Sequence, residues 1–244
     1  MSHHPPSTAF YITISAVVAV GGFALAGADL RADESAGDGF IRRVVEQTTR
    51  SGLAIRAVRE MRAGTVSGKH QGWMTVQTSA TPAGEFSWQV VNQGGSDRTR
   101  EKVLLAVLNT EAEAWRTQGH DGAALTPENY EFIPLAPTRP GQVQIQLKPR
   151  RVDARLINGI LTVQPDGYPI SLEGVLAKSP SFWVKSVKVT KRYSQFAGVA
   201  LPTVVESQAD LKLFGKSTFT MRYQYLEVNG RIFPPAHLTA GLNP

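Results

Sequence analysis

The stretches Val143-Gln-Ile-Gln-Leu147 and Phe219-Thr-Met-Arg-Tyr-Gln-Tyr225 both alternate apolar and polar side chains. A period of two places successive side chains on opposite faces of a β-strand. The alternation recurs in 170–176 and 199–213, and turn sequences such as Gln164-Pro-Asp-Gly167 separate the segments. Consecutive alternating strands joined by short turns predict an antiparallel meander in which each strand has one buried and one solvated face.

A meander of this length must curl or close to protect its edges. We therefore expect a mainly β fold, a strongly curved antiparallel sheet or open β-barrel with one or two covering α-helices. Alternation around 74–78 and 86–90, with the turn Thr81-Pro-Ala-Gly84 between them, adds two strands before the meander. Asn158-Gly159, flanked by apolar residues, predicts a further hairpin turn.

Two segments have a helical period instead. Ser96-Asp97 offers an N-cap, and the residues that follow at i, i+3, i+4 spacing are Val103, Leu104, Val107, Leu108, Glu111 and Trp115. Their single stripe predicts a helix lying against the sheet. The segment 40–62 has a similar period, interrupted at Ser51-Gly52, and predicts an amphipathic arm with basic residues on its outer side: Arg42, Arg43, Arg56 and Arg59. Such an arm either packs on the sheet with a solvated basic face or binds a partner or membrane surface.

The N-terminus has the pattern of a secretory signal. Residues 1–28 contain no Asp, Glu, Lys or Arg, and the apolar run Phe10–Ala28 ends in Ala24-Leu-Ala26 and Ala26-Gly-Ala28. The run is also about the ~20 residues that cross a bilayer, so an uncleaved anchor is the alternative. We expect a signal peptide or anchor over 1–28, a flexible lead-in over 29–39, one β-rich domain over 40–229 and a C-terminal tail over 230–244, in a periplasmic or otherwise exported protein.

The residues that catalysis and metal binding need are sparse. The chain of 244 residues has no cysteine, which excludes disulfides, thiolate ligands and a cysteine nucleophile. No ligand spacing relates the five histidines, which are His3, His4, His70, His120 and His237. Phosphate-binding loops and a G-x-S-x-G elbow are missing from the sequence. We expect no catalytic residues, no metal and no cofactor, and the dispersed net charge of +6 does not predict nucleic-acid binding.

The aromatic residues are the remaining candidates for a binding site. Those that could line an apolar cavity, together with one methionine, are Trp73, Trp88, Trp183, Phe219, Met221, Tyr223 and Tyr225. The same side chains could form a filled core, and the volume left inside the barrel distinguishes a scaffold from a binding site.

The order of these features resembles the periplasmic lipoprotein carriers with the LolA/LolB-like fold. The segment Gly159-Ile-Leu-Thr-Val-Gln-Pro-Asp-Gly-Tyr-Pro-Ile-Ser-Leu-Glu-Gly174 is similar to the strand-turn-strand of that family, and Tyr193 with Gly198-Val-Ala-Leu-Pro202 resembles stretches of related envelope proteins. The resemblance covers about 40–229. It implies an unclosed barrel with a helical lid over an apolar cavity.

Such a carrier is not an enzyme. It binds a lipid, an acyl chain or a lipidated protein in outer membrane lipoprotein sorting, and a lid-locking arginine would be one of Arg42, Arg43, Arg56 and Arg59. The alternative is an interaction module of the cell envelope, in which the basic arm docks on a protein or an anionic membrane. The sequence leaves the oligomeric state open.

Overall fold

The computed structural model describes residues 36–48, 52–68, 70–117, 121–136, 139–213 and 215–234. Within them, eleven strands form one antiparallel sheet in the order β3-β2-β1-β10-β9-β8-β7-β6-β5-β4, with β11 paired to β10. The strands are β1 (Ile55–Thr65), β2 (Gly72–Ala80), β3 (Phe86–Gly95), β4 (Tyr130–Pro134), β5 (Val143–Pro149), β6 (Ile157–Val163), β7 (Pro169–Leu176), β8 (Val184–Phe196), β9 (Val199–Leu211), β10 (Gly215–Val228) and β11 (Arg231–Ile232).

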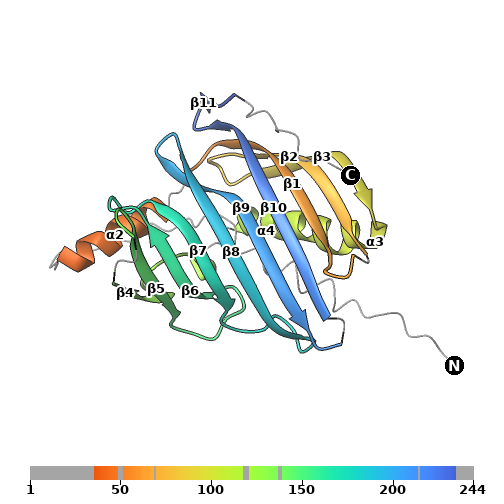
Figure 1. Ribbon diagram of the computed structural model, residues 1–244. Coiled ribbons are helices and arrows are strands. Elements are labelled where there is room, and N and C mark those ends of the chain that lie inside the picture. The colour runs from red at the N-terminus through yellow and green to blue at the C-terminus, as the bar shows by residue number, and fades with distance from the viewer. Residues whose placement is uncertain are drawn as a thin grey trace.

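The sheet is twisted and does not close, because its terminal strands in the described chain are β3 and β4 (Figure 1). The helical segments are α2 (Ala36–Thr48), α3 (Asp97–Thr99), the π-helical turn η2 (Arg100–Leu104), α4 (Leu105–Thr117) and the 3-10 turn η3 (Asp121–Ala123). α4 crosses behind the sheet in Figure 1, and α2 lies beside the β4–β7 half. The predicted fold class, a mainly β curved sheet with covering helices, is confirmed.

Buried side chains form three clusters on the inner face. The first packs α2 on strands β4–β9 through Val44, Ile145, Leu161 and Val189. The second packs η2 and α4 on β1, β2 and β10, and the third joins the other ends of β1, β9 and β10. None of the described helices is long and apolar enough to span a membrane.

The predicted helical arm over 40–62 is wrong in its second half. α2 ends at Thr48, and Ile55, Met61 and the residues between them belong to strand β1. In β1 the inward positions are apolar except for Arg59, whose charge disrupts the alternation that marks a strand. With Arg59 at an inward position, the apolar alternation of β1 is interrupted, and Ile55, Val58 and Met61 are left at the spacing of a helix.

The predicted Asn158-Gly159 turn is also wrong, because both residues lie inside β6. Gly159 is paired with Gly174 of β7, and a Cβ at Gly159 would lie 2.1 Å from the carbonyl oxygen of Glu173. The glycine is therefore needed for a close approach of two strands rather than for a turn. The predicted turn at 164–167 is confirmed, with Gly167 at φ +94°.

The ends of the predicted organisation are only partly described. The signal or anchor segment lies outside the described residues, as do 29–35 of the lead-in and 235–244 of the tail. α2 begins at Ala36, inside the predicted lead-in, and β11 lies at the start of the predicted tail.

Candidate functional site

The cover of the inner face is the helical segment from Asp97 to Thr117. The Ser96 hydroxyl accepts a hydrogen bond from the backbone N–H of Thr99 at 3.3 Å, and Asp97 favours the helix start by its charge. The predicted apolar stripe is confirmed, since each of its aliphatic members is at most 1% exposed: Val103, Leu104, Val107 and Leu108. This stripe faces the sheet.

Beneath the stripe, three methionines form one row across the sheet. Met61 of β1 is paired with Met221 of β10 on one side and with Met74 of β2 on the other. All three are at most 1% exposed, and apart from Met1 they are the only methionines of the chain. Methionine is unbranched and flexible, so it fills irregular gaps and adapts to new neighbours. The contact between helix and sheet is therefore made of side chains that can repack.

A buried ion pair ties the cover to the sheet. The guanidinium of Arg59 donates to both carboxylate oxygens of Glu111 on α4, at 2.5 and 2.9 Å, and to the hydroxyl of Thr78 at 3.1 Å. The two charged side chains are 5% and 8% exposed. Two donors of the guanidinium bind the carboxylate and a third binds the Thr78 hydroxyl. Such a bidentate pair with an additional hydrogen bond can offset the cost of removing both charges from water.

Aromatic rings enclose this ion pair. The guanidinium carbon of Arg59 lies 5.2 Å from the ring centre of Phe86 and 4.9 Å from that of Tyr223. Tyr223 stacks on Tyr225, whose hydroxyl donates to the carbonyl of Pro202 at 2.8 Å. Burial alone would lower the pKa of Arg59, but the Glu111 carboxylate more than offsets this and the net pKa is raised. The Arg59 guanidinium therefore stays protonated in the interior.

The row of inward side chains continues from the methionines to a buried lysine. Met221 is paired with Val205 of β9, and Val205 with Lys191 of β8. Lys191 is 4% exposed, and burial lowers its pKa to about 7. Burial raises the pKa of Tyr223 and of the nearby Tyr193 above the ordinary range, although both side chains keep some accessible surface. The row of inward side chains thus passes from three methionines to a buried amine.

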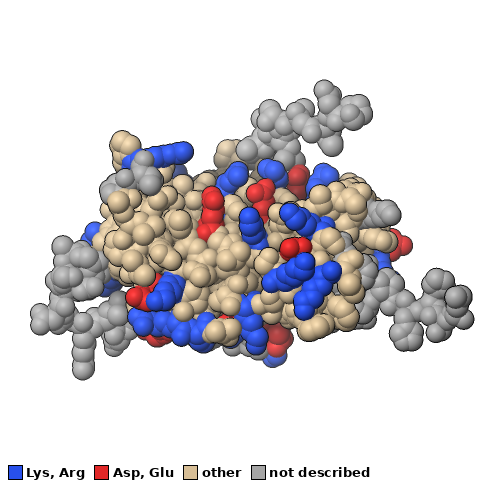
Figure 2. Space-filling model, turned by 60° about the horizontal axis from the view of Figure 1, so that its bottom comes forward, with Lys and Arg blue, Asp and Glu red and all other residues tan. Residues whose placement is uncertain are grey.

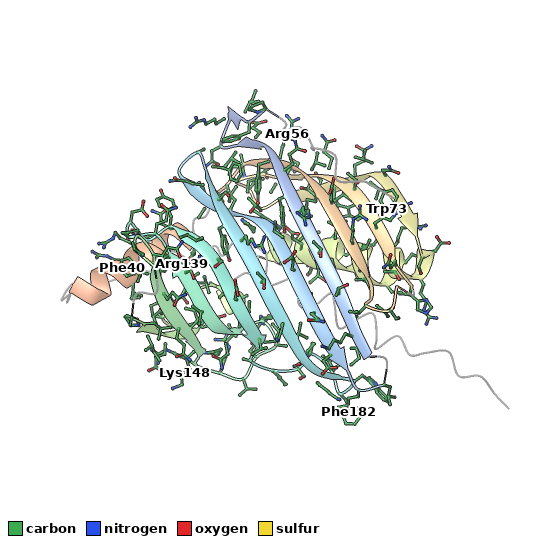
Figure 3. All side chains as sticks on the ribbon, viewed as in Figure 1. Phe40, Arg56, Trp73, Arg139, Lys148 and Phe182 are labelled. Atoms are coloured by element: carbon green, nitrogen blue, oxygen red, sulfur yellow. The ribbon has the colours of Figure 1, made fainter. Side chains whose placement is uncertain are left out.

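The aromatic candidates from the sequence lie in several places. Phe219 and Met221 are in the core beneath the helix, and Trp88 packs at the margin of that core. Tyr223 and Tyr225 are in the aromatic group around Arg59. Trp73 lies on the outer face, where its ring covers Gly94 (Figure 3). Trp183 lies in the β7–β8 loop.

The four arginines of the predicted arm do not form one surface. Arg42 and Arg43 lie on α2, whereas Arg56 lies on β1, 57% exposed, with an ion pair to Glu227 at 3.2 Å. Figure 3 separates Phe40 of α2 from Arg56 by the breadth of the sheet. Arg59 is the internal member of the set, buried under α4.

Sequence reasoning missed two residues of this site. Glu111 stood within the apolar stripe of the predicted helix but was given no partner. Lys191 follows Val187 and Val189 at the next inward position of its strand, and that alternation is the signal that could have revealed it.

The surface has two hollows, and the second shares Thr78 and Trp88 with the residues around Arg59. One, of about 280 Å³, is bordered by Arg62, Trp73 and Thr220, and another, of about 290 Å³, by Arg56, Gln77 and Trp88. Among the described residues no three His, Asp or Glu side chains gather as metal ligands, and His70 lies in a turn.

Two solved structures resemble this chain in fold. A LolA superfamily protein from Nitrosomonas europaea matches with a TM-score of 0.43 and 11% sequence identity over 82% of this chain and 96% of its own. A DUF1329 family protein from Desulfovibrio piger matches with a TM-score of 0.36 and 9% identity over 78% of this chain and 90% of its own. No protein-family model and no curated protein matches the sequence.

Proposed function

We propose that this chain binds an acyl chain, of a lipid or of a lipidated protein, between the α3–α4 cover and the inner face of the sheet. The observation that carries the proposal is the row of Met61, Met74 and Met221 beneath a helix whose polar link to the sheet is the Arg59–Glu111 pair. An acyl chain would enter by lifting the helix and replacing its stripe on the methionines. Each methylene buried there contributes about 0.8 kcal/mol, so a long chain can offset the contacts that the helix gives up.

The Arg59–Glu111 ion pair would return the helical cover to one position each time that it closes. A bidentate charge pair re-forms in one geometry, which returns α4 to the same register, whereas an apolar contact alone would tolerate several. Arg59 is the member of the four candidate arginines that we assign to this locking role. The protein would act as a carrier or shield outside the cytoplasmic membrane, where the leader predicted over 1–28 directs it, and it would need no catalytic residue.

The position of the ligand can be tested by fluorescence quenching with a brominated fatty acid. Four single-tryptophan variants are made by replacing the other three tryptophans with phenylalanine. The residues retained in turn are Trp73, Trp88, Trp115 and Trp183. Quenching is expected at Trp115 on α4 and Trp88 on β3, which border the covered face, and not at Trp73 on the outer face or Trp183 in a distant loop.

The outcome separates the proposal from a filled scaffold. Saturable quenching confined to Trp88 and Trp115 supports binding beneath the cover. Equal quenching at all four positions, or none at any of them, would overturn it. The apolar segment predicted at the N-terminus does not confuse this readout, because it contains no tryptophan and the quenching is local.

The second candidate, an interaction module that uses a basic arm, would need its arginines on one surface. Arg42 and Arg43 can still serve a partner from α2, but Arg56 and Arg59 lie elsewhere. Substituting Arg42 and Arg43 by glutamine would abolish partner recovery under that proposal and leave acyl-chain binding unchanged under the first.

A further inference from the structure

Four loops lie at one end of the sheet, and each carries a large apolar side chain in water. They join β1 to β2, β5 to β6, β7 to β8 and β9 to β10, and they follow the lower margin of Figure 1. The exposed side chains, with their exposed fractions, are Val66 (60%), Val152 (76%), Phe182 (74%), Trp183 (38%) and Leu213 (69%). Single exposed apolar residues are ordinary, but one or more in every loop of one sheet end is a pattern.

The loops at the opposite end are different. They consist of turn sequences such as Gln164-Pro-Asp-Gly167 and Asn229-Gly230, and in their described parts none carries a large exposed apolar side chain. The remaining large apolar residues with high exposure are on strands: Val91, Ile160, Val175 and Ile232. Ile232 of β11 lies at the opposite end (Figure 1), so that end has one large exposed apolar side chain where the first has five.

Contacts between the loops hold the exposed side chains outward. The rings of Phe182 and Trp183 meet edge to face at 5.4 Å, and the Lys212 ammonium lies 3.7 Å from the ring centre of Phe182. The backbone N–H of Lys212 donates to the carbonyl of Trp183 at 3.0 Å, which joins the β7–β8 and β9–β10 loops. A further hydrogen bond joins Val66 to Lys216 at 2.9 Å. The tips are thus a built surface rather than separate loose turns.

Cations surround these tips. The exposed basic residues in the four loops and the adjoining strand ends are Arg150, Arg151, Arg155, Lys178, Lys185, Lys212 and Lys216. The nearby carboxylates are Asp153, which pairs with Arg151 and Arg155, Glu128, which lies near Arg150, and Asp210, opposite Lys216. Figure 2 turns this end toward the viewer and shows more Lys and Arg than Asp and Glu over it. An excess of positive charge remains around the apolar tips.

We infer that this end of the sheet docks on an anionic lipid bilayer. Tryptophan and phenylalanine favour the interfacial layer of a membrane, and lysines beside them are attracted to anionic head groups. The apolar tips are spread along the whole sheet end, and a fluid, flat surface can accept all of them together. The inference does not depend on the acyl-chain site, which lies under α4.

Because the chain has no cysteine, single cysteines carrying an environment-sensitive fluorophore can map the contact in the full chain. Labels replace Phe182 and Leu213 at the docking end, and Val91 and Ile232 as equally exposed controls. Vesicles are phosphatidylcholine alone or an equal mixture with phosphatidylglycerol. A blue shift is expected at Phe182 and Leu213 with the mixture and not at the two controls. The labels report position, so tethering through the predicted leader alone gives no shift at any of the four.

Charge and apolar variants complete the test. Replacing Lys185 and Lys216 with glutamine weakens binding to the mixed vesicles by roughly fivefold for each lysine. Phe182→Ser weakens binding by at least about tenfold, whereas Ile232→Ser changes nothing. Because both side chains are exposed, Ile232→Ser keeps the wild-type melting temperature and Phe182→Ser, which loses only its surface contacts with Trp183 and Lys212, lowers it slightly. Equal shifts at all labels, no shift at any label, or indifference to phosphatidylglycerol would overturn the inference.

Discussion

The buried pair of Arg59 and Glu111 can be removed one charge at a time. Arg59→Met keeps an unbranched side chain and deletes the guanidinium, which leaves a carboxylate that is 8% exposed without its two donors. Glu111→Leu leaves the guanidinium with the Thr78 hydroxyl and two aromatic rings. Removing one partner of a buried pair costs about 3–5 kcal/mol. We expect each single variant to lose that much of the free energy of unfolding, a large part of the 5–15 kcal/mol typical of a domain.

The double variant should behave differently. With Arg59→Met and Glu111→Leu together, no unpaired charge is left and the space is filled by apolar groups. Buried pairs replaced in this way leave stability about unchanged or raise it by about 1–4 kcal/mol. The double variant is therefore expected to recover most of the loss of either single variant, while losing the register that the bidentate contact imposes on α4.

Urea denaturation, followed by circular dichroism and tryptophan fluorescence, measures these differences. Hydrogen exchange over 97–117 should be faster in both single variants, because the cover loosens before the sheet does. Arg56→Met is the matched control, since its ion pair with Glu227 is exposed and contributes about 0–1 kcal/mol. Single variants that cost less than about 1 kcal/mol, or a double variant whose cost is the sum of the two, would refute the reasoning.

Three further predictions use the same measurements. Burial lowers the pKa of Lys191 to about 7, below its unfolded value of about 10.4, so the unfolded chain binds more protons between these values. The stability of the wild type relative to Lys191→Leu should therefore rise with pH above about 7, by up to about 1.4 kcal/mol per pH unit, and a flat difference would contradict this. Gly159→Ala should cost about 3 kcal/mol because its Cβ meets the Glu173 carbonyl oxygen. Gly52→Ala, with open space at φ +69°, should cost about 1 kcal/mol. Equal losses of unfolding free energy in the two glycine variants would argue against the close approach of Gly159 to Glu173. Met61→Ala should cost about 2–5 kcal/mol in the same urea titration, and a loss below about 1 kcal/mol would mean that the row is not packed.

Part of the candidate site could be read from the sequence. Met221, Tyr223 and Tyr225 fall on the inner face because the alternation of their strand is unbroken from Ser217 to Tyr225. The α4 stripe was equally clear, and it already contained Glu111. Arg59 was named as a candidate but assigned to the outside of a helix. Arg59 stands at an inward position of a strand and Glu111 in the apolar stripe of a helix, where a charge is unexpected. Each charge is explained by its pairing with the other, which is 52 residues away.

The local pattern determined most of the strands, the buried faces of those strands and where the helical cover begins, because those properties follow from side-chain period and capping within a few residues. Only the tertiary structure decided that β1 is a strand, that Gly159 meets Gly174, that Arg59 pairs with Glu111 and that four loop tips gather at one end. These depend on strand order and register, which bring together residues that are distant along the chain and that no local window compares.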